Sequence, residues 1–375
     1  MEKIKMVDLQ SQYLRIKPEI DAAIQQVLDS TAFIQGPSVG VFAGALSAYL
    51  GGIQVIPCAN GTDALQIAMM ALGFKPGDEV ILPVHTYVAT AEVIALLGLV
   101  PVFAEVDPHT FNLDASRIEA LITPRTVAIV PVHLYGQCAD MEAILTIAEK
   151  YALHVIEDSA QALGAVYTFS DGTVKKAGTM GTIGCTSFFP SKNLGCYGDG
   201  GALFTHDASL AEKIRMVANH GQRVKYQHDL VGVNSRLDTL QAAILNVKLK
   251  YLDGYTARRN AVAAYYDEAL ADLPGLHTPY RAVNSTHAFH QYTIIVDSGR
   301  DALKDYLEKK GIPTMIYYPI PLHLQQAYRR DGFARGSFPL TERLSDTVLS
   351  LPIDTEIQPD QLVYITEAVA AYFGN

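Results

Sequence analysis

The sequence between about residues 50 and 205 alternates short apolar runs with longer amphipathic segments. The runs are rich in valine and isoleucine, and apolar side chains occupy consecutive positions in them. Strands with this pattern are apolar on both faces and lie in sheets that helices cover on each side. The runs therefore predict an α/β domain. They read VIPCAN, EVILPV, VPVFAEV, VAIVPVHLYG, HVIEDSA, GCTSFF and GGALFTH.

The segments between these runs carry apolar residues at helical spacing, as in TDALQIAMMALG, TAEVIALLG and MEAILTIAEKYA. Repeated strand-helix-strand units follow from this alternation. Beyond about residue 250 the pattern changes to long helices around an isolated strand, HQYTIIVD. We therefore expect a large domain over residues 1–250, which includes an N-terminal helix and arm, and a smaller α+β domain over residues 251–375.

Composition narrows the possible partners and the cellular location. The chain has 29 Lys and Arg against 39 Asp and Glu, a net charge of -10, which disfavours nucleic acid as a partner. Its four cysteines show no metal-type C-x-x-C spacing and are too few for a disulfide scaffold, so no metal site is expected. The N-terminus lacks the apolar run of a signal peptide, and no stretch is long enough to span a membrane. We expect a cytoplasmic protein.

The segment CANGTDALQ follows a predicted strand and begins a predicted helix. Gly61 allows close approach of the backbone, and the N–H groups of a first helical turn have no acceptor within the helix. Such a helix start suits a phosphate. On these residues alone, an ordinary turn capped by Thr62 or Asp63 remains an alternative.

A second candidate is Asp158 in VIEDSAQALGA, at the carboxyl end of an apolar strand. Open α/β sheets place their ligand sites at this end. A buried carboxylate needs a cationic partner, and a protonated pyridine nitrogen would serve, which would also make the ring a better electron sink. Helix capping is the alternative use of Asp158 that the residues leave open.

A third candidate, Lys192, follows 34 positions later in GCTSFFPSKNLGCYGDGGALF. Its apolar neighbours can desolvate the amine, which lowers the lysine pKa and frees the amine to form an imine. A solvated loop lysine is the alternative. The glycines of this segment are spaced G-x-x-G-x-G and precede a strand, unlike a dinucleotide-binding fingerprint.

Five segments in order along the chain resemble the DegT/DnrJ/EryC1/StrS family of sugar aminotransferases: GTDAL, PVHTYVAT, EDSAQALGA, SFFPSKNLGCYGDGGA and VNSRLDTLQAAIL. The resemblance covers almost the whole chain. It implies the fold-type-I architecture of aspartate aminotransferase, with a mostly parallel seven-stranded sheet between helices and a smaller α+β C-terminal domain. It also implies pyridoxal 5'-phosphate as cofactor and a homodimer with shared active sites.

The resemblance further implies a role for each matching position. Lys192 matches the lysine that holds the cofactor as a Schiff base and then acts as the catalytic base. Asp158 matches the partner of the pyridine nitrogen, and Gln161 the residue that binds the phenolic oxygen. Tyr87 matches the aromatic residue that stacks on the ring. The phosphate contacts match Gly61, Thr62 and Ser187, together with Asn234 from the neighbouring subunit.

Within the family, strings such as YGQCADM and VGVNSRLDTLQAAIL are most similar to members that aminate UDP-2-acetamido-2-deoxy-3-oxo-glucuronate for O-antigen or other surface polysaccharide. Glutamate is the amino donor that the family implies. A sugar carboxylate calls for an arginine or for hydrogen-bond donors in the pocket. The candidate substrate contacts are therefore Arg236, Tyr317, Tyr318 and His323.

Two departures from the family pattern bear on the sugar. The chain has Tyr317-Tyr318 where a His-Tyr pair is expected, and His85 where an aromatic residue or serine is expected before Thr86. Aminotransferases for other UDP- or dTDP-linked 3- or 4-keto-sugars therefore stay open. A sugar dehydratase of the same fold is disfavoured because such relatives replace the lysine with histidine. A non-catalytic regulator is disfavoured by the complete set of Lys192, Asp158 and Gln161.

Overall fold

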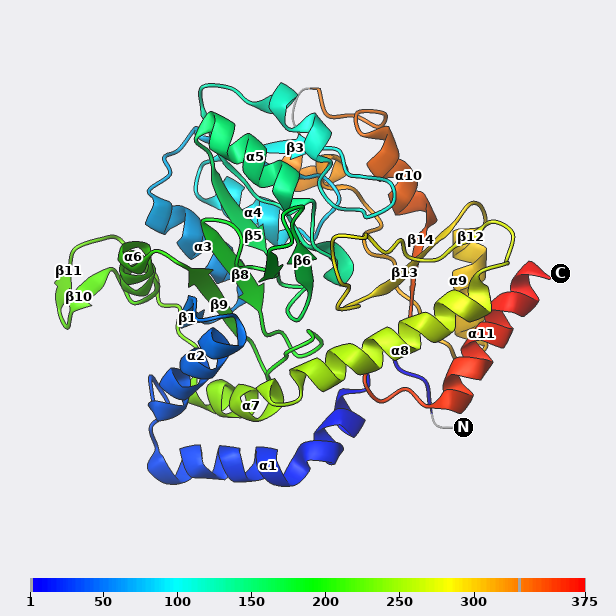
Figure 1. Ribbon diagram of the computed structural model, residues 1–375, viewed down its shortest axis with the longest axis horizontal. Helices are drawn as coiled ribbons and strands as arrows, with labels where there is room; N and C mark the ends of the chain where they lie inside the picture. Colours follow the sequence, from blue (N-terminus) through cyan, green and yellow to red (C-terminus); the bar gives the residue numbers. More distant parts are fainter. Residues whose placement is uncertain (1–2, 330–331, 375) are drawn as a thin grey trace.

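The computed structural model describes residues 3–329 and 332–374, so the outermost positions of the predicted domains, 1–2 and 375, lie outside it. At its centre is a seven-stranded sheet with strand order β1-β9-β8-β5-β4-β2-β3 (Figure 1). Neighbouring strands are parallel except at β9, which runs antiparallel to β1 and β8. The predicted mostly parallel sheet is thus confirmed. Its strands are β1 (Gln54–Cys58), β2 (Glu79–Pro83), β3 (Val100–Ala104), β4 (Thr126–Ile129), β5 (His154–Asp158), β8 (Ile183–Ser187) and β9 (Gly201–Thr205).

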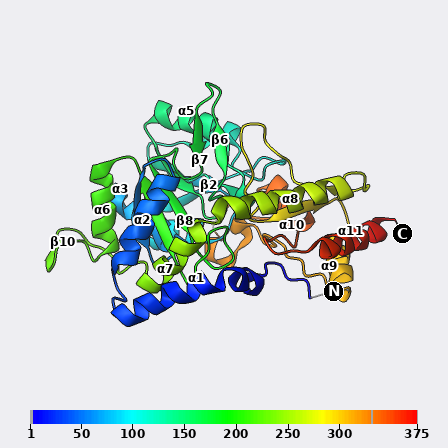
Figure 2. The ribbon, with the colours of Figure 1, turned by 60° about the horizontal axis from the view of Figure 1, so that its bottom comes forward.

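Helices cover both faces of this sheet because successive strand residues point to opposite sides. Ile56 and Leu203 pack in a core with α3, α4 and α6, whereas Val55 and Phe204 pack in another with α2 and α7. Helix α5 covers the rest of this second face. Figure 2 shows the two helical layers. Their bounds are α2 (Pro37–Tyr49), α3 (Gly61–Leu72), α4 (Ala89–Leu96), α5 (Met141–Tyr151), α6 (Ala208–Ala218) and α7 (Thr239–Leu249).

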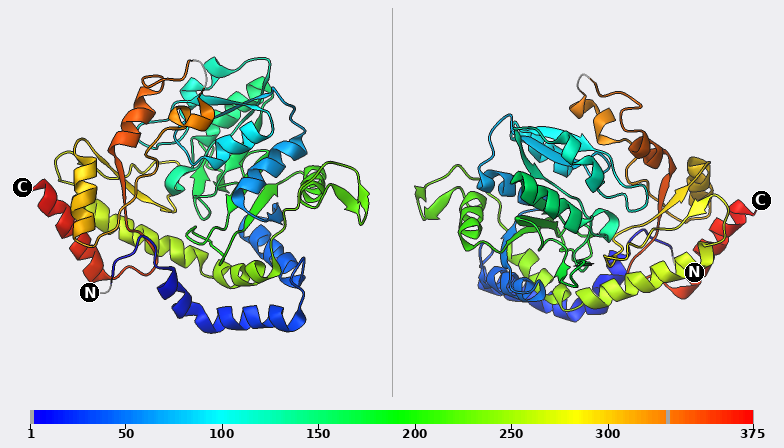
Figure 3. Two further views of the ribbon diagram at one scale, coloured as in Figure 1. Left: turned by 180° about the vertical axis from the view of Figure 1, so that it is seen from behind. Right: turned by 45° about the horizontal axis from the view of Figure 1, so that its top comes forward.

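The C-terminal part builds a separate core around a three-stranded antiparallel sheet of order β12-β13-β14. Helix α8 runs from the large sheet to this unit, and α9 and α11 pack with it in the core of the unit (Figure 3). An α+β unit is therefore present, while the boundary at residue 250 stays a prediction. The elements are α8 (Leu252–Leu270), β12 (Leu276–His277), β13 (Tyr292–Val296), α9 (Arg300–Lys309), α10 (Pro339–Thr347), β14 (Val348–Leu351) and α11 (Pro359–Phe373).

The N-terminal arm contacts both units of the chain. Helix α1 (Leu9–Ser30) packs against α7, but Ile4 before it is buried in the core of the C-terminal unit. The backbone N–H of Asp8 donates to Asp354 Oδ2 at 2.6 Å, and Arg15 forms an ion pair with Glu356 at 2.6 Å. The arm therefore ties the C-terminal unit to the large one.

Two hairpins complete the architecture: β6 (Val166–Thr168) with β7 (Val174–Lys176), and β10 (Gln222–Val224) with β11 (Gln227–His228). The second hairpin projects from the body of the molecule (Figure 1). Within residues 3–329 and 332–374, no helix is both long and apolar enough to cross a bilayer. All four cysteines are buried free thiols.

The carboxylate of Glu157 anchors the end of β5 from the side opposite Asp158. It is fully buried and accepts hydrogen bonds from the backbone N–H groups of Gly178, Met180 and Gly181 at 2.5–2.8 Å. His133 Nδ1 accepts from the N–H of Ala139, so its Nε2 carries the proton and donates to Glu157 at 2.9 Å. Four donors thus satisfy this carboxylate, and the strand end is fixed.

We predict that Glu157→Ala lowers the free energy of unfolding by about 3–5 kcal/mol, because it leaves several buried donors without an acceptor. The matched control is Glu119→Ala, which removes an exposed carboxylate paired with Lys150 and should cost less than about 1 kcal/mol. Urea titrations of both variants measure the difference. Equal stability of the two would contradict the anchoring role.

Candidate active site

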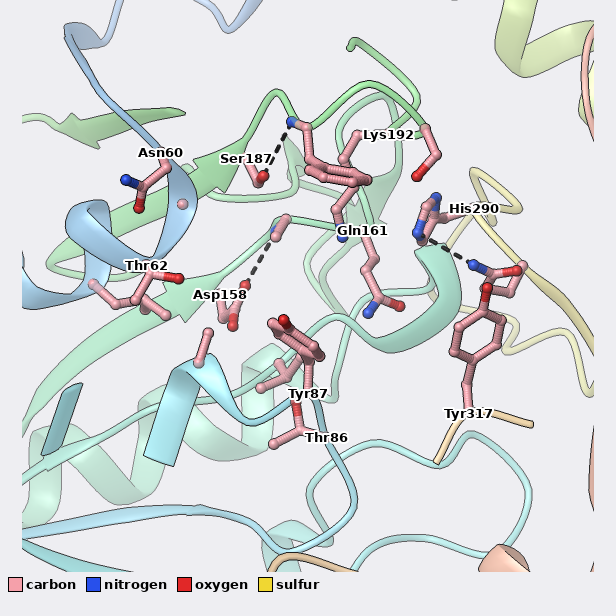
Figure 4. Close-up of a pocket in the computed structure, with 18 of the residues that line it drawn as sticks. Asn60, Thr62, Thr86, Tyr87, Asp158, Gln161, Ser187, Lys192, His290 and Tyr317 are labelled. Carbon is pink, nitrogen blue, oxygen red and sulfur yellow. Dashed lines mark hydrogen bonds between the residues drawn. The ribbon is translucent and has the colours of Figure 1, made fainter. Parts of the chain in front are cut away.

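A cavity of about 630 Å³ opens at the carboxyl end of the central sheet. Asp158 at the end of β5, Gly61 at the start of α3 and Lys192 in the loop after β8 all line it. The C-terminal unit contributes His290 and Tyr317 (Figure 4). Segments distant in sequence thus meet at the edge where open α/β sheets place their ligand sites.

The start of α3 forms one side of the cavity. Asn60 Oδ1 accepts from the N–H of Asp63 at 2.7 Å, so the helix cap is Asn60 and neither of the two residues considered from the sequence. A Cβ at position 61 would lie 2.7 Å from the Cβ of Ser187, so glycine is required for this close approach. The first-turn N–H groups of Gly61 and Thr62 have no helical acceptor. With Ser187 they form a cradle for an anion.

Asp158 presents a buried carboxylate to the cavity, with only 7% of the residue exposed. Its Oδ1 accepts from the N–H of Ala160 at 3.2 Å, and its Oδ2 accepts from the hydroxyl of Thr90 at 2.8 Å. Both donors are neutral, and within the described part of the chain Asp158 forms no ion pair. A buried anion in this state favours a cationic ligand.

Lys192 lies in the cavity and not in solvent, which rules out the solvated loop lysine considered from the sequence. Its backbone N–H donates to the carbonyl of Phe189 at 2.8 Å and fixes the loop. Burial lowers the pKa of the Lys192 amine to about 8, and the Asp158 carboxylate opposes part of this shift. The neutral amine at pH 7 rises from about one molecule in three thousand to about one in ten. An amine so poised can act as a nucleophile or a base.

The amide of Gln161 is held in one orientation. Its Oε1 accepts from the N–H of Tyr135 at 2.7 Å, and its Nε2 donates to the hydroxyl of Tyr318 at 3.1 Å. Because the backbone donor fixes the oxygen, the NH₂ group is the side that faces the cavity. Gln161 can therefore donate to an oxygen of a ligand there.

Aromatic rings form another wall of the cavity. Tyr87 is 56% exposed, and its ring lies 6.0 Å from that of Tyr318 at an angle of 43°. The Tyr135 hydroxyl donates to the carbonyl of Tyr317, and His85 Nε2 in turn lies 3.2 Å from that hydroxyl. Burial lowers the pKa of His85 to about 4, so its ring is neutral at physiological pH. The exposed ring of Tyr87 offers one flat, apolar face on which a ring-shaped ligand can stack.

The sequence did not point to His290 and Gln291, which also line the cavity. Their Nε2 atoms lie 3.3 Å apart, and His290 Nδ1 has no hydrogen-bond partner within the described residues. Burial and the nearby Lys192 and Arg259 charges hold the pKa of His290 well below its usual range. The available signal was a polar pair directly before the apolar strand YTIIV.

His323, a predicted substrate contact, is not among the residues that line this cavity. It is fully buried, donates from Nε2 to Glu342 at 2.9 Å and packs on the ring of Phe338. Glu342 also accepts from backbone N–H groups at Gly336 and Phe338. The structure thus gives His323 a partner in the core and places it outside the lining of this cavity.

Arg236 and Asn234 also lie away from the cavity of their own chain. Arg236 lines a separate groove that Arg215 and Arg223 share, and Asn234 is exposed beside it. The other predicted residues are brought together: Gly61, Thr62, Tyr87, Asp158, Gln161, Ser187, Lys192, Tyr317 and Tyr318.

The cavity fits pyridoxal phosphate, which carries a phosphate, a protonatable ring nitrogen and an aldehyde. The cradle at Gly61 suits the phosphate, the Asp158 carboxylate suits a protonated ring nitrogen, and the Lys192 amine suits the aldehyde. In the described residues, no cluster of three or more histidine, cysteine or acidic side chains is arranged to hold a metal ion.

Known proteins are similar to this chain in sequence and fold over nearly its full length. The chain is 49% identical over 366 residues to the UDP-2-acetamido-2-deoxy-3-oxo-D-glucuronate aminotransferase of Pseudomonas aeruginosa, with 98% of this chain and 99% of that protein covered. It is 46% identical over 376 residues to a pleiotropic regulatory protein of Geobacillus stearothermophilus, with 99% of both covered. The crystal structure of S. venezuelae DesV in complex with a ketimine intermediate superimposes with a TM-score of 0.96 at 41% identity, with 100% of both chains covered.

The family assignment rests on the extent of the match. The pattern of the DegT/DnrJ/EryC1/StrS aminotransferase family matches residues 14–370, which include every segment that lines the cavity. Pyridoxal phosphate is the cofactor on which its aminotransferases depend. The chain belongs to the DegT/DnrJ/EryC1/StrS aminotransferase family.

Proposed function

We propose that this enzyme transfers an amino group from glutamate to UDP-2-acetamido-2-deoxy-3-oxo-glucuronate in the biosynthesis of a surface polysaccharide. The observation that carries the chemistry is the meeting of the Lys192 amine and the Asp158 carboxylate in one cavity. The observation that carries the substrate is the 49% identity to the Pseudomonas aeruginosa enzyme over nearly both chains.

Bound pyridoxal phosphate supplies an electron-withdrawing ring that carries the amino group between the two substrates. The Asp158 carboxylate would hold a proton on the ring nitrogen, and Gln161 Nε2 would donate to the ring oxygen. The N–H groups of Gly61 and Thr62 would bind the phosphate, as would the Ser187 hydroxyl. The Tyr87 ring would stack on the cofactor.

Lys192 Nζ moves the proton during transfer. A partly neutral amine with a pKa of about 8 can accept a proton near neutral pH and return it, which is what a general base and acid requires. Lys192 also attaches the cofactor between turnovers.

The sugar substrate has a second candidate, a neutral keto-sugar linked to UDP or dTDP. Among the described residues, those that line the cavity include Lys192 but no arginine. A sugar carboxylate would therefore be bound by neutral donors such as Tyr317 and Gln291, or by Arg236 of a second copy of the chain. A neutral UDP- or dTDP-linked keto-sugar would not need that charge, and it is the second candidate.

We also propose that the chain acts as a homodimer in the cytoplasm. Asn234 and Arg236 are predicted ligand contacts that lie outside their own chain's cavity, which a second subunit would explain. The free thiols of all four cysteines suit a reducing compartment. A nucleotide-linked sugar and glutamate are its proposed small-molecule partners.

The substrate proposal predicts amination of the UDP-linked 3-oxo-uronate in the presence of glutamate, with a product mass that shows replacement of the keto oxygen by an amino group. A panel that includes neutral UDP- and dTDP-keto-sugars, read by mass spectrometry, tests it. Lys192→Ala provides the inactive control. Turnover of a neutral sugar with none of the uronate would transfer the assignment to the second candidate.

The cofactor role predicts that purified protein is yellow and that borohydride reduction fixes the cofactor covalently on Lys192. Peptide mapping by mass spectrometry locates the attachment. Lys192→Ala should fold, because a loop lysine contributes little packing, and should retain no covalent cofactor after reduction. Attachment at Lys175 or Lys176 would refute the assignment.

The shared site predicts complementation between Lys192→Ala and Asn234→Asp. Each homodimer should be inactive, the second because its carboxylate repels the cofactor phosphate. In a mixed dimer one site keeps both native residues, so activity should return to about half of a native dimer per heterodimer. Native mass spectrometry must show subunit exchange. Exchange without recovered activity would mean that Asn234 serves its own subunit.

A further inference from the structure

The buried hydroxyl of Thr90 is hydrogen-bonded to the Asp158 carboxylate. Thr90 lies in the first turn of α4, is fully buried and does not line the cavity. A helical threonine can return its hydroxyl to a backbone carbonyl one turn earlier. Here the hydroxyl instead donates to Asp158 Oδ2 at 2.8 Å, so the hydrogen bond joins helix α4 to the end of strand β5.

This hydrogen bond has only one possible direction, because an ionised carboxylate accepts and cannot donate. The Ala160 N–H occupies Oδ1 and the Thr90 hydroxyl occupies Oδ2, so each oxygen has one fixed neutral donor. Two donors on separate oxygens fix the plane of the carboxylate. They leave a lone pair on each oxygen available to a ligand in the cavity.

We infer that Thr90 is a positioning residue that orients the Asp158 carboxylate toward the nitrogen of the cofactor ring. This inference rests on the proposed role of Asp158. Charge-assisted hydrogen bonds depend strongly on direction, and a carboxylate free to rotate would lose part of its interaction with a cationic nitrogen. Thr90 therefore acts through Asp158 and makes no contact with substrate or cofactor.

A thermodynamic cycle between the two positions tests this directly. The cofactor dissociation constant is measured by absorbance titration of cofactor-free protein for wild type, Thr90→Val, Asp158→Asn and the double variant. Thr90→Val should weaken cofactor binding about 10-fold or more, because it removes a hydrogen bond to a charged group. Thr90→Ser keeps the hydroxyl and should stay within about threefold of wild type.

The double variant separates a positioning role from a merely structural one. If Thr90 acts through Asp158, Thr90→Val should add less than about threefold in the Asp158→Asn background, because coupled residues are not additive. Losses that multiply would overturn the inference. Thr205→Val is the matched control, since its buried hydroxyl donates to the Thr182 carbonyl outside the cavity. It should leave cofactor binding unchanged.

The other outcomes are also decisive. Thermal unfolding of the cofactor-free proteins shows whether each variant folds, and Thr90→Ala replaces the valine variant if that one does not. Normal cofactor affinity and turnover in Asp158→Asn would refute the proposed function of Asp158 itself. Weak binding in Asp158→Asn with normal binding and normal spectra in Thr90→Val would refute only the positioning role.

Discussion

Two adjacent carboxylates at the end of β5 set the constraint on which the site depends. Successive strand residues face opposite sides, so Glu157 and Asp158 cannot share an environment. Glu157 is saturated by protein donors and holds the strand end in place. Within the described part of the chain, Asp158 receives two neutral donors, and it remains available to a ligand. A one-residue shift in register would exchange these roles and leave the cavity without its anion.

The sequence was most informative where local pattern and burial agree. The double-sided apolar runs predicted the sheet because strands covered by helices must be apolar on both faces, and parallel strands then bring Asp158 to the ligand-binding edge. Gly61 was identifiable because it stands between a predicted strand and a predicted helix, where a glycine permits close approach of the backbone. The structure adds that a side chain there would meet Ser187. For Asp158 and Gly61, the local sequence pattern that suggests the chemistry also determines where the residue lies in the fold.

Other residues could not be placed, because their surroundings come from distant segments. His323 and Arg236 have side chains that suit a ligand, yet Glu342 holds the first in the core and the fold directs the second into a separate groove. His290 was missed because its position in the cavity depends on how the C-terminal unit meets the large sheet. The spacing of apolar residues along the chain does not predict how the C-terminal unit packs against the large sheet. Residues at the carboxyl ends of the central strands, such as Asp158 and Ser187, are therefore more predictable as cavity residues than His290, whose place depends on packing between distant segments.

The N-terminal arm has a consequence for the order in which the molecule is completed. The bond between Asp8 and Asp354 joins residues 346 positions apart, and Ile4 is buried among residues of the C-terminal core. During synthesis, Ile4 and Asp8 must wait until the chain has been made beyond residue 354 before they reach their native contacts. The large sheet can form earlier, since its strands are encoded between residues 54 and 205. Because His290 and Tyr317 come from this later part of the chain, a nascent chain that has been made only as far as residue 205 has the sheet but lacks that wall of the cavity.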